Sequence, residues 1–111
     1  MKIEQQQVGT VEVFTPVGAL VDQDGEAFGK MLGQRLSAVN PRVVVAMHDV
    51  PYVDSAAIEG LLSATEGLHE RASALKLAAV TPTCREILEL TGLAPRFRFF
   101  KDVQDAVKSF L

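Results

Sequence analysis

The residues of this chain best suited to chemistry are Asp54 and Ser55, within the segment VDSAAIEGLL that runs from Val53 to Leu62. They stand where an apolar run ends and a helical pattern begins. A serine that opens a helix can cap it, because its oxygen accepts a hydrogen bond from one of the first helical N–H groups. The same hydroxyl can accept a phosphate, and the positive end of the helix dipole favours added negative charge. Local chemistry therefore favours a helix cap and leaves a phosphorylation switch open.

Motifs for catalysis and for cofactor binding are missing from the rest of the sequence. There is no G-x-S-x-G elbow for a nucleophilic serine and no G-x-x-x-x-G-K-[ST] phosphate loop. The single Cys84 cannot form an internal disulfide, and we expect it to be a partly buried thiol in a helix. His48 and His69 have no metal-site spacing. We therefore expect a protein that is not an enzyme and that binds neither a metal nor a cofactor.

Size and charge narrow the class of protein further. With 111 residues, 48% of them hydrophobic, the chain predicts one folded domain over residues 1–111. A net charge of −3 gives no electrostatic reason to bind nucleic acid. The basic and aromatic segment RFRFFK, Arg96 to Lys101, is better explained as an edge strand with phenylalanines inward and arginines outward. Without a signal peptide or a membrane-length apolar stretch, we expect a cytoplasmic protein that does not insert into membranes.

The elements that position Asp54 and Ser55 follow from changes in the period of the apolar pattern. A strand is predicted over Val8–Val17, paired with Met1–Gln7 as a hairpin across Gly9, and a buried central strand over Arg42–His48. A second helix starts at Ser55, has an apolar stripe from Ile58 to Ala72, and carries its polar residues on the face that exposes this serine. The other predicted elements are a helix from Ala27 to Ala38 between Gly25 and Asn40-Pro41, a strand from Leu75 to Val80, a helix from Thr81 or Thr83 to Thr91, a strand at Phe97–Phe100 and a helix from Val103 to Phe110. This alternation predicts an α/β layer structure.

The order of these elements and two motifs resemble the STAS domain family of anti-sigma factor antagonists. In that family a buried strand leads into a D-S-[ST]-G-[LI] segment, which corresponds here to Asp54–Ile58. A later helix ends in a T/S-G-L sequence, which corresponds to Thr91–Leu93. The resemblance covers nearly the whole chain and implies a mixed sheet of four to five strands flanked by about four helices.

The resemblance also implies a function, which is a binding role in partner switching. Such a protein binds a serine kinase that doubles as an anti-sigma factor, and phosphorylation ends the binding. Carried over by position, the phosphoacceptor is Ser55 and the acid before it is Asp54. The expected partner-binding residues are Asp22, Asp54, Ser55, Ala56, Ala57 and Glu59. The oligomeric state is left open.

Three departures from the family pattern affect this transfer. Ala56 and Ala57 replace a second hydroxyl residue and a glycine, which predicts a stiffer, more helical backbone. Glu59 places a charge where many relatives have glycine. Asp22 is displaced by one position in the loop that commonly adjoins the functional helix. We therefore expect the partner surface to be altered.

Two alternatives stand beside the phosphorylation switch. One is a constitutive STAS scaffold, for example a subunit of a lipid-transport or stress-sensing complex, in which Ser55 only caps a helix. The other is a sensor that binds a nucleotide or another small anion at the helix N-terminus near Ser55.

Overall fold

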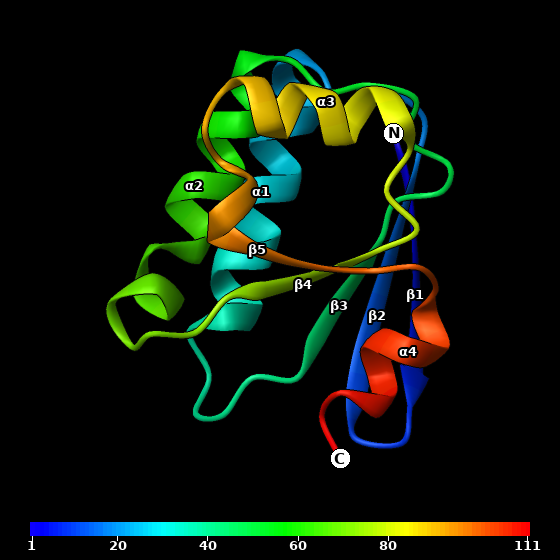
Figure 1. The fold of residues 1–111 in the computed structure, drawn as a ribbon, viewed down its shortest axis with the longest axis vertical. Coiled ribbons are helices and arrows are strands. Elements are labelled where there is room, and N and C mark those ends of the chain that lie inside the picture. The colour runs from blue at the N-terminus through cyan, green and yellow to red at the C-terminus, as the bar shows by residue number, and fades with distance from the viewer.

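The computed structural model describes residues 1–111, and strands and helices alternate along the chain as Figure 1 shows. In order, the elements are β1 (Lys2–Val8), β2 (Val11–Val17), α1 (Asp22–Leu36), β3 (Val43–Ala46), α2 (Ser55–Glu70), β4 (Leu75–Ala78), α3 (Pro82–Leu90), the 3₁₀ turn η1 (Ala94–Arg96), β5 (Phe97–Phe100) and α4 (Val103–Lys108). None of the helices has both the length and the apolar character needed to cross a membrane.

The strands form one five-stranded sheet in the order β1-β2-β3-β4-β5. β1 and β2 are antiparallel, joined at Gly9 with its left-handed backbone (φ 61°), and the later strands all run parallel to β2. β3 lies in the centre, and all four of its residues are buried. The predicted hairpin, the central strand and the α/β class are therefore confirmed.

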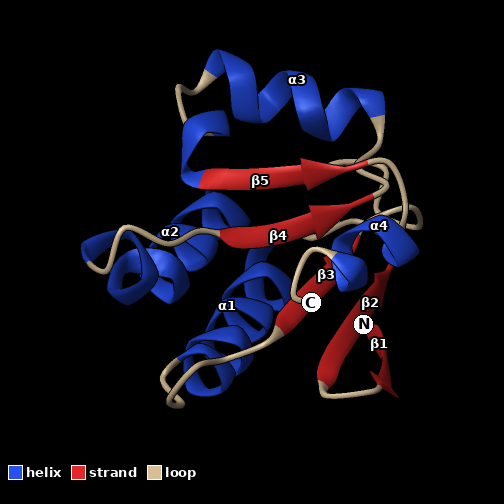
Figure 2. Ribbon diagram, turned by 60° about the horizontal axis from the view of Figure 1, so that its bottom comes forward, coloured by secondary structure: helices blue, strands red, loops and turns tan.

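Helices cover both faces of the sheet (Figure 2). The larger core lies under α1, α2 and α3, where Phe28, Leu61 and Leu88 pack against the sheet. A smaller core lies on the opposite face, where Ala106 of α4 packs on Val44 and its neighbours. Because β2 to β5 are parallel, their carboxyl ends lie at one edge of the sheet, and α1 and α2 both start from that edge.

The structure corrects several predicted details of the elements. Helix α1 begins at Asp22 rather than Ala27, because Gly25 lies inside the helix and does not start it. It also ends at Leu36, before the predicted Ala38. Ala72, which we expected in the apolar stripe of α2, lies beyond the end of that helix and is exposed, with φ 56°.

The last strand also differs from its prediction. Phe97 and Phe99 lie edge to face, whereas Phe100 packs with the core under α4, because neighbouring residues of a strand point to opposite faces. Arg96 does not point outward from the strand, since it belongs to η1 and its Nε is buried without a hydrogen-bond partner. β5 is an edge strand, as predicted.

Candidate functional site

Asp54, not Ser55, caps helix α2. The Asp54 carboxylate accepts a hydrogen bond from the backbone N–H of Ala57 at 3.1 Å, and its own backbone is extended, as expected of a capping residue. The prediction that Ser55 supplies the cap is therefore wrong, because Ser55 is already the first helical residue. The capping position belongs to the residue before it.

The same carboxylate joins α2 to the start of α1. The backbone N–H of Asp22 donates to Asp54 Oδ2 at 2.9 Å, so the structure brings these two acidic residues together. Asp22 has a left-handed backbone (φ 51°), which aspartate tolerates better than most residues. Hydrogen bonds from the Asp22 and Ala57 N–H groups lower the pKa of the Asp54 carboxyl below its usual value.

Backbone contacts fix this junction further. The loops that follow β2 and β3 pair through an isolated parallel bridge between Leu20 and Val53. The N–H of Leu20 donates to the Tyr52 carbonyl, and the N–H of Asp54 donates to the Leu20 carbonyl, both at 3.2 Å. These bonds connect the two loops at the start of α2, where the carboxyl ends of the parallel strands lie.

Ser55 is exposed at the N-terminus of α2, and its hydroxyl makes no hydrogen bond within the chain. The first turn of α2 contains no acidic residue, so Asp54 before the helix and Glu59 after its first turn are the nearest acids in sequence. Because Asp54 does the capping, the Ser55 hydroxyl is free for modification or for a partner.

The residues after Ser55 divide between two surroundings. Ala56 and Glu59 line an open groove of about 390 Å³ between α1 and α2, together with Glu26 and Lys30 of α1. Ala57 instead is 2% exposed and packs against α1. Its expected role in direct partner contact is therefore wrong, since its side chain belongs to the contact between the two helices.

Two glycines of α1, which are not among the predicted site residues, set the shape of this site. A Cβ placed on Gly25 would lie 2.8 Å from the Ala57 Cα, and one placed on Gly29 would lie 2.6 Å from the Gly60 Cα. Helices α1 and α2 therefore approach closely only because these positions lack side chains. The signal in the sequence is the four-residue spacing of Gly25 and Gly29 within an amphipathic pattern.

The loop between β3 and α2 is also held by α3. The Thr81 hydroxyl and the Cys84 thiol both donate to the Val50 carbonyl, at 2.9 and 3.3 Å. Thr81 is thus the N-cap residue of α3 by position, but its hydroxyl holds this loop instead of capping. Cys84 is fully buried rather than partly buried, and burial raises the pKa of its thiol. On the outer side of the loop, Tyr52 is 49% exposed.

Comparisons with known proteins agree with this architecture. The sequence profile of the STAS domain matches residues 2–106. None of the curated proteins matches the chain in sequence.

Solved structures with the same fold have low sequence identity. An anti-sigma-factor antagonist (STAS) domain protein from Planctomyces limnophilus has a TM-score of 0.79 at 19% identity, over 96% of each chain. An anti-sigma factor antagonist from Mycobacterium paratuberculosis has a TM-score of 0.78 at 21% identity, over 97% of this chain and 92% of that one. A sulfate transporter family protein from Wolinella succinogenes has a TM-score of 0.72 at 19% identity, over 94% and 88% of the two chains. At these identities the likeness shows a shared fold.

Proposed function

The chain belongs to the STAS domain family, and from this premise we propose that it is an anti-sigma factor antagonist-like binding protein in a partner-switching pathway. Its partner is an anti-sigma factor that is also a serine kinase, and phosphorylation of Ser55 ends the binding. The observation that carries the proposal is the exposed Ser55 hydroxyl at the start of α2, which Asp54 relieves of the capping role. This role belongs to the cytoplasm, where the protein would regulate transcription.

The electrostatics of the junction support a phosphate that blocks binding without unfolding the domain. A phosphoserine carries about −1.5 to −2 charges at neutral pH, and a helix N-terminus is a favourable place for them. Its charge would add to that of Asp54, directly before it, and of Glu59 in the next turn. A partner surface that faces this cluster pays desolvation and repulsion once the phosphate is added.

The binding surface would be built around the start of α2. Its proposed contacts are Asp22, Asp54, Ser55, Ala56 and Glu59, and the groove between α1 and α2 extends it. The half-exposed Tyr52 lies in the loop that leads to Asp54, and tyrosine is among the residue types that most often dominate interface energies. Ala57 contributes from within, by setting the position of α2 against α1.

Phosphorylation assays test the switch directly. The purified protein is incubated with ATP and each anti-sigma-type serine kinase encoded in the same genome, and the modified residue is located by mass spectrometry. We expect phosphate on Ser55, loss of the signal in Ser55→Ala, and an unchanged signal in Ser63→Ala, a matched exposed serine of the same helix. Phosphate on another residue, or none with any of these kinases, would contradict the proposal.

The constitutive scaffold is the second candidate function. The observation that favours it is the fold shared with a sulfate transporter family protein. The charged Glu59 beside the groove also leaves the surface acidic before any phosphorylation. In a scaffold, Ser55→Asp would bind the partner as tightly as the wild type, whereas in the switch this variant would lose binding.

A further inference from the structure

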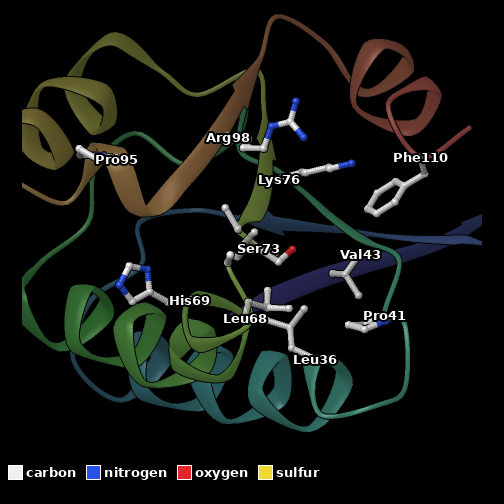
Figure 3. Close-up of a pocket in the computed structure, with 13 residues that line it drawn as sticks. Leu36, Pro41, Val43, Leu68, His69, Ser73, Lys76, Pro95, Arg98 and Phe110 are labelled. Carbon is white, nitrogen blue, oxygen red and sulfur yellow. The ribbon is translucent and has the colours of Figure 1, made fainter.

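A second hollow lies at the edge of the sheet opposite to Ser55. It has a volume of about 530 Å³ and opens between the ends of α1 and α2, the first residues of β3 and β4, and the C-terminal segment (Figure 3). Leu36, Leu68 and Phe110 give it apolar walls, and Lys76 and Arg98 give it two cationic groups. Its size lies within the range of about 300 to 1,000 Å³ found for small-molecule sites.

Lys76 is the unusual residue of this cavity. It lies on β4, between β3 and the edge strand β5, and is only 8% exposed, yet it forms no salt bridge. The ammonium nitrogen stands 3.5 Å from the centre of the Phe110 ring. Burial, together with the nearby charges of Arg98 and Arg42, lowers the pKa of Lys76.

The positive charges around Lys76 are not balanced by acids. Arg98 stands directly opposite Lys76 on the neighbouring strand β5, where like charges destabilise a sheet. The guanidinium of Arg42, just before β3, bonds to the neutral hydroxyl of Thr10 at 2.9 Å. Although the chain has 14 acidic residues and a net charge of −3, no Asp or Glu lines the cavity.

We propose that this cavity is a binding site for a small anionic amphiphile, a molecule with one carboxylate or phosphate group on an apolar body. The head group is held by Lys76 and Arg98, and the apolar body lies against Leu36, Leu68 and Phe110. A bound anion supplies the charge that the cationic groups lack. This site is separate from Ser55 and does not depend on the proposed switch.

Binding is tested by titrating the full chain with octanoate or octyl phosphate and measuring the chemical shifts of its backbone amides in solution. Octan-1-ol serves as the neutral analogue and inorganic phosphate as the head group alone. We expect both amphiphiles to bind more tightly than either control and to shift the amides of residues 42, 43, 73–76 and 98. Three results would overturn the proposal. These are binding of octan-1-ol or of phosphate alone as tight as that of the amphiphiles, shifts confined to other residues, or no binding of either amphiphile.

Variants identify the cationic groups. Lys76→Met should weaken octanoate binding by about tenfold or more, as expected for the loss of a charge-assisted contact. Lys108→Met, which removes an exposed lysine outside the cavity, should leave binding unchanged. If Lys76→Met does not fold, Arg98→Gln at the exposed edge replaces it with the same expectation. Wild-type affinity in the folded variant would refute the assignment of the head group.

Discussion

One carboxylate, that of Asp54, organises the candidate site. It caps α2 through the N–H of Ala57 and holds the start of α1 through the N–H of Asp22. The resemblance predicts an acid before the phosphoacceptor, and in the structure this acid connects the starts of α1 and α2. Ser55 is free to be modified because its neighbour supplies the helix cap.

Asp54→Asn should therefore destabilise the protein in a pH-dependent way. Asparagine has one acceptor oxygen, so one of the two N–H donors loses its partner. Because the pKa of Asp54 is lowered on folding, its contribution is complete above the unfolded value near 3.8 and is lost as pH falls through the folded pKa. Urea denaturation should show a lower free energy of unfolding for the variant at neutral pH and a smaller gap in acid.

The matched control for this change is Asp49→Asn, in the same loop, where the carboxylate is exposed and contacts only His48, at 3.3 Å. It should leave the free energy of unfolding close to that of the wild type. Equal effects of the two substitutions would mean that Asp54 does not hold the junction.

For Lys76 we predict the opposite effect, which is a substitution that raises the free energy of unfolding. Lys76→Met should raise the free energy of unfolding at neutral pH by about 1 kcal/mol, because it replaces a buried, unpaired charge with an apolar side chain. The pKa of Lys76 is lowered on folding. Between the folded value and the ordinary value of 10.5, the unfolded chain therefore binds more protons than the folded chain, and the wild type gains stability as pH rises through that interval. The advantage of the variant should shrink as pH approaches 10.5. Urea denaturation over this pH range measures the effect, with Lys108→Met as control. The same pH dependence of the free energy of unfolding in both variants would contradict the prediction.

At the scale of elements, the periodicity of apolar residues predicts most of the strands and helices. The hairpin at Gly9 and the buried strand β3 were predicted correctly, because alternation and β-branched runs are local signals. The predicted start of α1 at Ala27 is wrong, because a glycine usually indicates the end of a helix, whereas Gly25 lies inside α1. A glycine is needed at position 25 because α2 approaches α1 there. This contact joins residues far apart in the chain, and no local pattern shows it.

The candidate site was predictable to the same extent. The motif placed Asp54 and Ser55 at the start of a helix, and the structure confirms that location. Which of the two caps the helix, and that Ala57 faces α1, depend on side-chain directions that only the packed helices determine.

The close contact of α1 and α2 can be tested at its glycines. Gly29→Ala should lower the free energy of unfolding by about 1–3 kcal/mol, because the new Cβ would lie 2.6 Å from backbone atoms of Gly60. Gly33→Ala in the same helix meets only ordinary contact, 3.8 Å from the Ala64 Cα, and should be neutral or stabilising by up to about 1 kcal/mol. Thermal or urea unfolding checks both, and equal stabilities would show that the helices can separate at no cost.

At the scale of the whole molecule, helix α2 connects two different surfaces. Ser55 starts it at the carboxyl edge of the sheet, and Leu68 near its end lines the cavity that contains Lys76. A helix of 16 residues spans about 24 Å, which exceeds the screening length of about 8 Å at physiological ionic strength. A charge added at Ser55 should therefore act locally.

Ser55→Asp tests this separation together with the mode of switching. We expect partner binding to be lost while the free energy of unfolding changes by less than about 0.5 kcal/mol, because the helix N-terminus favours the new charge and Asp54 opposes it. Amide shifts should change around Asp22 and the first turn of α2 and stay constant at Lys76. Shifts that spread to β4, or a large loss of stability, would instead indicate a phosphate that acts by rearranging the fold, and Ser55→Asn, similar in size but neutral, would then distinguish charge from bulk.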